Sequence, residues 1–205
     1  MANAGDELVS PLGDRLRFVR TARDTGGTLL EMEMVYRPRS TAPPLHRHPF
    51  QEERFEVLRG EIRATIGRET RTYRPGDTFV VPANVAHTMA NVSFEEGALR
   101  WQVRPALDTE TFFETMWGLA RDGRTGANGV PPLLHTAVLM RAYRREFRLV
   151  HPVAPLLQML FGVLAPLGRL RGYRARYERY SGSPEGSAPS SAVSASGSET
   201  GRPVA

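Results

Sequence analysis

Residues 43–61 of the chain read PPLHRHPFQEERFEVLRGE, and residues 74–91 read RPGDTFVVPANVAHTMAN. Both segments alternate apolar and polar residues and are interrupted by glycine and proline, a pattern typical of short β-strands joined by tight turns. They also contain three of the five histidines of the chain, His46, His48 and His87. His46 and His48 are two residues apart, so on an extended strand both rings project from the same face. The two segments therefore predict a metal site on a small β-barrel.

A carboxylate completes the predicted ligand set. Glu53 begins the alternating run after the histidine pair, and strand alternation places Glu52 and Glu56 on the opposite face. If these strands line one cavity, three imidazoles and one carboxylate converge there. Such a nitrogen–oxygen set suits Fe(II), Mn(II), Ni(II), Cu(II) or Zn(II). The chain contains no cysteine, which excludes thiolate zinc sites, iron–sulfur clusters, disulfides and cysteine nucleophiles.

The surrounding sequence continues the β pattern. Two alternating runs separated by Gly26 and Gly27 predict a pair of antiparallel strands from residue 14 onwards. Short strands at this close spacing indicate an all-β sandwich or barrel over residues 14–106. Residues 1–13 show no periodicity, and we expect them to form a loose N-terminal arm.

The spacing of these residues resembles the two-part motif of the cupin superfamily. In the first part a His-x-His pair precedes a glutamate and a glycine, here His46, His48, Glu53 and Gly60. In the second part glycine, proline, glycine, histidine and asparagine follow at fixed intervals, here Gly76, Pro82, Asn84, His87 and Asn91. Asn84 stands where the family has glycine. Asparagine tolerates a left-handed backbone best after glycine, so we expect the turn to survive the change.

The resemblance implies a small, single-domain cupin of type 2 over residues 14–106. Its expected fold is a double-stranded β-helix, the cupin or jelly-roll barrel, and its expected metal ligands are His46, His48, Glu53 and His87. The cofactor is a divalent transition metal, and Fe(II) is the ion that we favour. Three neutral histidines and one carboxylate leave about two open positions at octahedral coordination, which can chelate a substrate or bind dioxygen.

The reaction is less defined, because the superfamily includes dioxygenases, isomerases, decarboxylases and non-catalytic proteins. We expect a metal-dependent enzyme, an oxygenase or related oxidoreductase, acting on a small organic substrate inside the barrel. The alternative is a non-catalytic metal- or ligand-binding or regulatory module, tethered to a partner or a membrane surface through its basic C-terminal helices. No catalytic acid or base can be identified. The apolar side chains expected to line a pocket, unless they are simply barrel core, are Met32, Met34, Phe55, Met89 and Trp101.

Beyond Pro105 the apolar period becomes helical. We expect a helical extension over residues 107–180, with segments at 109–123, 133–150 and 152–168. The third segment is apolar on nearly all sides, but its 17 residues are interrupted by two prolines and a glycine. It is therefore too short and too broken for a membrane span.

Arginines and tyrosines border this third segment. Such a helix either packs on the barrel or on a second subunit, giving a homodimer, or contacts an anionic membrane surface through residues 152–180. No nucleic-acid-binding motif is recognisable, so we expect no nucleic-acid partner. Residues 181–205 are rich in serine, glycine, alanine and proline, and we expect a disordered tail. Residues 1–13 show no secretory signal, so a cytoplasmic location is expected, with peripheral membrane contact as an addition.

Overall fold

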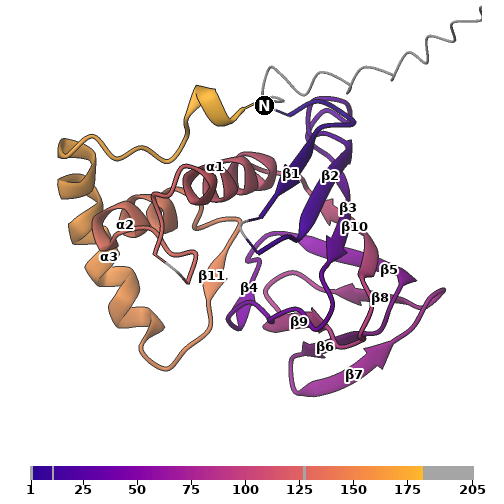
Figure 1. Ribbon diagram of the computed structural model, residues 1–205. Helices are drawn as coiled ribbons and strands as arrows, with labels where there is room; N and C mark the ends of the chain where they lie inside the picture. The colour runs from indigo at the N-terminus through magenta and orange to yellow at the C-terminus, as the bar shows by residue number, and fades with distance from the viewer. Residues whose placement is uncertain (1, 11, 127, 182–205) are drawn as a thin grey trace, which may run out of the picture.

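The computed structural model describes residues 2–10, 12–126 and 128–181 of the chain. The predicted tail, residues 181–205, lies outside the described residues except for Ser181. The first half of the chain is β-structure and most of the second half is helical (Figure 1). The strands are β1 (Glu7–Val9), β2 (Arg15–Arg20), β3 (Leu30–Tyr36), β4 (His46–Arg47), β5 (Glu52–Arg59), β6 (Ile62–Ile66), β7 (Glu69–Tyr73), β8 (Thr78–Val81), β9 (His87–Asn91), β10 (Gly97–Arg104) and β11 (Arg148–Leu149). The helices are α1 (Thr109–Arg121), α2 (Leu133–Ala142), α3 (Ala154–Leu170) and the short 3-10 helix η1 (Glu178–Tyr180).

The strands form two antiparallel sheets. One has six strands in the order β1-β2-β3-β10-β5-β8, and the other has five in the order β11-β4-β9-β6-β7. Strands distant in sequence are neighbours in both sheets, as in β3 with β10 and β4 with β9. The main apolar core contains buried residues from both sheets, so the sheets face each other across it. The mainly β jelly-roll barrel with a helical C-terminal extension is thus confirmed.

Alternation along the strands explains the core. In β5 the side chains of Glu53, Phe55 and Val57 are buried, whereas Glu52 and Arg54 are exposed. Each large apolar side chain buried in this way contributes about 1.5–3 kcal/mol to stability. The same alternation that fills the core also turns Glu53 inward, which is the unusual position for a carboxylate.

Two turns of the motif depend on a left-handed backbone. Gly60, between β5 and β6, has φ +76°, and a Cβ there would lie 2.7 Å from the Cα of Gly97. Asn84 has φ +67°, so the expectation that asparagine supports this turn in place of glycine is confirmed. The backbone N–H of Asn84 donates a hydrogen bond to the carbonyl of His48, with N and O 2.7 Å apart. This turn therefore helps to position a histidine of the predicted metal site.

Part of the expected N-terminal arm is ordered as a strand. Residues 7–9 form β1, which pairs with β2 from Glu7 opposite Arg17 to Val9 opposite Arg15. Ala2 is also buried in the main core. Three residues are too few to show a period of two, so the sequence pattern gave no sign of this strand.

The helix predicted over residues 133–150 is too long. Helix α2 ends at Ala142, the chain turns, and Arg148 and Leu149 form β11, which pairs with Arg47 and His46 of β4. An open sheet edge presents unpaired backbone groups, and β11 satisfies those of β4. The extension is therefore joined to the barrel by backbone hydrogen bonds, and its helices lie together on one side (Figure 1).

Helix α3 packs on α2 through small residues. A Cβ at Gly168 would lie 2.6 Å from the carbonyl oxygen of Leu134, so glycine is needed for this close approach. Ala165 is also buried in the contact between the two helices. Among the described helices, α3 included, none combines the length and the hydrophobicity that crossing a bilayer requires.

Candidate metal centre

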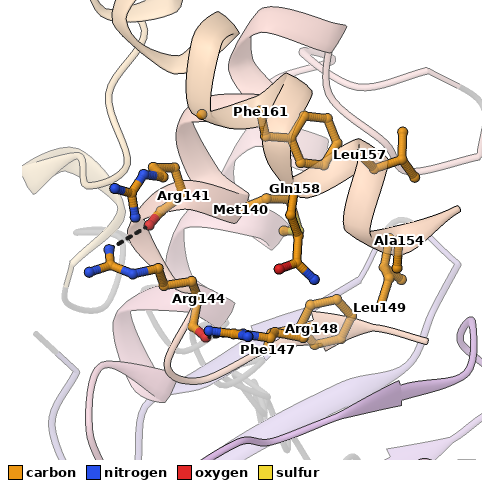
Figure 2. A pocket seen from close by; sticks show the side chains of 11 residues that line it. Met140, Arg141, Arg144, Phe147, Arg148, Leu149, Ala154, Leu157, Gln158 and Phe161 are labelled. Carbon is orange, nitrogen blue, oxygen red and sulfur yellow. Dashed lines mark hydrogen bonds between the residues drawn. The ribbon is translucent and has the colours of Figure 1, made fainter. Parts of the chain in front are cut away.

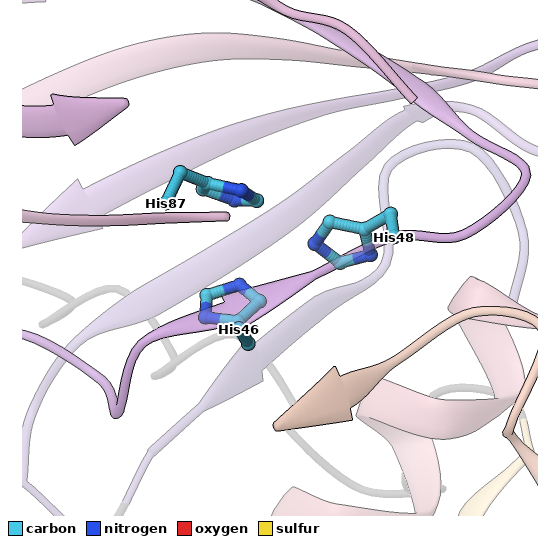
Figure 3. A group of neighbouring side chains, drawn as sticks. All are labelled: His46, His48 and His87. Carbon is cyan, nitrogen blue, oxygen red and sulfur yellow. The ribbon is translucent and has the colours of Figure 1, made fainter. Parts of the chain in front are cut away.

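The four predicted ligands come from both sheets. His46 lies on β4 directly opposite His87, the first residue of β9, and His48 follows β4. Glu53 is the second residue of β5 in the facing sheet. Figure 3 shows the three histidine rings turned toward one another. Because one strand pair and one facing strand supply the side chains, the cluster lies between the sheets, next to the core.

The donor atoms are close together and shielded from solvent. One ring nitrogen from each of His46, His48 and His87 lies within 4.8 Å of the others. The Oε2 atom of Glu53 is 3.0 Å from Nε2 of His87 and 3.3 Å from Nε2 of His48. The histidines are 2–8% exposed and Glu53 is 1% exposed. The structure thus brings the four residues together in one buried cluster.

Backbone carbonyls orient each imidazole. The Nδ1 atom of His46 is 2.8 Å from the carbonyl oxygen of Pro44, and that of His87 is 3.2 Å from the carbonyl of Val85. His48 Nδ1 is 2.5 Å from the carbonyl of Glu146. A carbonyl oxygen only accepts, so the proton of each neutral ring resides on Nδ1 and the lone pair on Nε2. This is the tautomer and orientation of a histidine that binds metal through Nε2.

The electrostatic environment favours the metal-binding protonation states of His46, His48 and Glu53. Burial, together with the His87 and His48 rings, lowers the pKa of His46 to about 4, and burial also lowers the pKa of His48. Burial acts to raise the pKa of Glu53, but His48, His87 and His46 outweigh it and the pKa is lowered. Glu53 is therefore ionised at neutral pH, while His46 and His48 are neutral, as metal coordination requires.

The cluster has an excess of acceptors. Within the described residues, Nε2 of His48 is buried without a hydrogen-bond partner. The contact of His87 Nε2 with Oε2 of Glu53 outweighs the effect of burial and raises the pKa of His87, so metal binding would displace a proton from this ring. A metal ion would bind Nε2 of the three histidines and the carboxylate of Glu53 at the same time. Two ligands about 2.1 Å from an ion and at right angles are about 3.0 Å apart, close to the nitrogen–oxygen distances around Glu53. The residues present therefore fit a divalent metal ion.

The family comparison agrees with this arrangement. Residues 32–103 match the family model described as the cupin domain. Residues 32–103 of the barrel are therefore a cupin domain. The match includes all four residues of the cluster. It ends before α1 and therefore includes none of the helical extension.

The chain is similar in sequence to plant proteins and shares features of fold with solved bacterial structures. The chain is 33% identical over 110 residues to germin-like protein 3-5 and to germin-like protein 3-6 of Oryza sativa subsp. japonica, a match that covers 48% of this chain and 48% of each relative. The chain thus spans about half the length of the curated relatives it matches. Among solved structures, KdgF from Halomonas sp. is 18% identical with a TM-score of 0.45, covering 51% of this chain and 90% of that one. A predicted oxalate decarboxylase from Thermotoga maritima is 15% identical with a TM-score of 0.45, covering 49% and 92% of the two chains.

The apolar residues expected to line a pocket lie inside the cupin domain. Met32, Met34, Phe55 and Met89 are buried in the main core, and Trp101 packs against it. The Phe55 ring stacks between Phe79 and Trp101 at centroid distances of 4.9 and 5.6 Å. These side chains are part of the barrel core, and their contact with a ligand stays a prediction.

Trp101 has a second role that its hydrophobicity did not indicate. Its indole Nε1–H donates a hydrogen bond to Oε1 of Glu53, with N and O 3.1 Å apart. Trp101 pairs across the strands with Phe55, two positions from Glu53, which places the indole beside the carboxylate. The bond fixes one oxygen of Glu53 and leaves Oε2 directed at the histidines.

The extension supplies two residues of the site that sequence reasoning missed. The backbone carbonyl of Glu146 accepts a hydrogen bond from Nδ1 of His48. The Phe147 ring stacks on the His46 ring at a centroid distance of 4.8 Å and an interplanar angle of 24°. Phe147 also stacks on Phe112 of α1 at 5.7 Å. No local signal identified these residues, because they belong to the segment predicted as helix and act only through the pairing of β11 with β4. The helical extension therefore covers the metal centre of the cupin domain.

Proposed function

We propose that the cupin domain binds one divalent transition-metal ion, preferentially Fe(II), through Nε2 of His46, His48 and His87 and the carboxylate of Glu53. We further propose that the protein is a metal-dependent oxidoreductase of the oxygenase type that acts on a small organic molecule. The main support is the convergence of ligand atoms: the Nε2 atoms of three imidazoles, each oriented by a carbonyl at Nδ1, meet one ionised carboxylate.

The residues around the cluster prepare it for this role. Trp101 restrains Glu53, and Phe147 and the apolar core keep bulk water from the imidazoles. When bound, an ion held by three neutral ligands and one carboxylate retains positive charge and can polarise a substrate oxygen or bind dioxygen. The apolar residues of the barrel core favour an aromatic or otherwise hydrophobic substrate over a sugar.

Metal content and oxygen uptake test this proposal together. We expect about one equivalent of iron per chain after purification under reducing conditions, and oxygen consumption with candidate phenols or diketones. His48→Ala should abolish both. His151→Ala is the matched control, because His151 is exposed and lies outside the cluster. A stable protein that takes up no divalent metal would contradict the whole proposal.

A second candidate function is a non-catalytic metal or ligand-binding module. The observation in its favour is the cover over the site, since Phe147 stacks on His46 and the histidines are at most 8% exposed. Catalysis requires Phe147 to move aside when a substrate enters. Phe147→Ala should therefore preserve or increase oxygen uptake if the protein is an enzyme. Stoichiometric metal without uptake in the wild type and in Phe147→Ala would favour the binding module.

A further inference from the structure

A second site lies in the extension, outside the cupin domain. A cavity of about 270 Å³ opens between α2, β11 and α3. This volume is just below the range of about 300–1,000 Å³ that is usual for small-molecule sites. Figure 2 shows arginine side chains on one side of the cavity, apolar side chains of α3 on the other, and the Gln158 amide between them.

The arginine side has donors without acidic partners. Arg141, Arg144 and Arg148 form no ion pair with any residue in the described ranges. Arg144 donates from Nη1 to the carbonyl of Arg141 at 3.2 Å, and Arg148 donates from Nε to the carbonyl of Arg144 at 3.0 Å. Each guanidinium has five N–H donors, so most of them stay available for a ligand.

The opposite side is apolar. Leu157 and Phe161 of α3 face the arginines across the cavity, and Met140 and Phe147 complete the apolar part of the lining. Such a surface binds hydrocarbon and has nothing to offer a small inorganic anion. A ligand that matches both sides carries a negative headgroup on an apolar chain.

We propose that this pocket binds an anionic amphiphile, a molecule with a carboxylate or phosphate headgroup on an apolar chain. Arg141, Arg144 and Arg148 hold the headgroup by charge-assisted hydrogen bonds, and Gln158 contributes an amide. The chain lies against Leu157 and Phe161. The inference goes beyond the proposed function and does not depend on it, since no residue of the metal cluster lines the pocket.

The outer face of α3 offers room for a longer chain. Leu156, Met159 and Val163 are 66%, 72% and 68% exposed, and no residue from Val153 to Gly168 is charged. The same headgroup chemistry could reach the pocket on a free single-chain amphiphile or on a phospholipid in a bilayer. Calorimetric titration of the free amphiphile and sedimentation with vesicles separate these two sources.

Calorimetric titration tests the free form. Decanoate and decyl phosphate, below their micelle-forming concentrations, should bind saturably with a stoichiometry of one. Decanol, which is uncharged, and decyltrimethylammonium, which is a cation, should bind at least about tenfold more weakly. Equal binding of decanol would overturn the proposal. The titration is repeated after metal chelation, so that a failure of the metal site does not affect the result.

Two kinds of variant locate the binding site. Arg144→Gln and Arg148→Gln should each weaken decanoate binding about tenfold. Arg68→Gln, an exposed arginine in the turn between β6 and β7, is the charge-matched control. Gly162→Leu should block the pocket without harming the fold, because a Cβ at Gly162 meets no atom within 4 Å and leucine is the better helix former. Unchanged affinity in all three pocket variants would contradict the assignment.

Vesicle sedimentation tests the bilayer form. Binding to vesicles with phosphatidylglycerol but not to pure phosphatidylcholine, reduced by Arg144→Gln and Gly162→Leu, would support the pocket with a membrane lipid as its source. Vesicle binding that these variants do not change would overturn the pocket and assign the contact to α3 alone. Absence of binding to both the free amphiphiles and the vesicles would also overturn it.

Discussion

The metal centre of the barrel and the arginine pocket of the extension are opposite electrostatic arrangements in one chain. At the metal centre three imidazoles and a carboxylate bring acceptors together, almost fully buried. At the pocket three guanidinium groups bring donors together at the surface. Each arrangement therefore calls for a ligand of opposite charge, a cation in the barrel and an anion in the extension.

The difference in burial shows how each site is specified. The metal centre is held by backbone carbonyls, paired strands and an indole, so its geometry is fixed before a ligand binds. The pocket depends on long arginine side chains, of which Arg144 and Arg148 are held by one backbone carbonyl each. Phe147 belongs to both sites, since one contact of its ring is with His46 and it also lines the pocket. The comparison predicts two sites that can be disabled separately and are coupled through this ring.

The largest effect is expected from removing a metal ligand. His87→Ala should lower the affinity for Fe(II), or for Co(II) as a spectroscopic probe, by more than about a hundredfold, because loss of a supporting residue alone commonly costs 10–100-fold. Metal titration followed by optical absorption checks this. Decanoate should still bind the pocket of this variant, with the affinity that the metal-free wild type has. A parallel loss of both ligands, with a normal circular dichroism spectrum, would show that the two sites are one.

A smaller effect is expected from loosening Glu53. Trp101→Phe keeps an aromatic ring against Phe55 but removes the N–H that binds Oε1 of Glu53. We expect metal affinity to fall about tenfold, as is usual when a hydrogen bond to a ligand is lost. Trp117→Phe is the matched control, because Trp117 packs against the same core and its ring contacts Phe113. Equal metal affinity in both variants would remove Trp101 from the site.

The sequence predicted the site in the barrel better than it predicted the contributions of the extension. The barrel and the convergence of His46, His48, Glu53 and His87 could be anticipated because alternation and motif spacing are local and set the direction of each side chain. The contributions of Glu146 and Phe147 could not be anticipated in this way. They depend on where α2 ends, and the apolar spacing of that segment allows a helix as well as a strand. The arginine pocket was also missed, since it requires the packing of α3 on α2.

Coupling between the sites should be detectable but modest. A ligand in the pocket contacts Phe147, which also stacks on His46, so saturating decanoate should change metal affinity by about fivefold, at the lower end of typical coupling. By thermodynamic reciprocity, the metal should change decanoate affinity by the same factor. Phe147→Ala should abolish the coupling while both ligands still bind. Coupling that persists in Phe147→Ala would require another route between the sites.

The smallest effect is expected at the turn that supports His48 and has no contact with the pocket lining. Asn84 holds φ +67° and donates its N–H to the carbonyl of His48. Asn84→Ala places an ordinary side chain in the left-handed region and should reduce the free energy of unfolding by about 1 kcal/mol, measured by urea denaturation. Asn84→Gly restores the residue usual in the cupin motif and should change it by no more than about 0.5 kcal/mol. Because both variants keep the backbone N–H, metal affinity should change less than about threefold, and decanoate affinity should stay the same. A large loss of metal affinity in Asn84→Gly would mean that the asparagine side chain itself, and not the turn, maintains the metal centre.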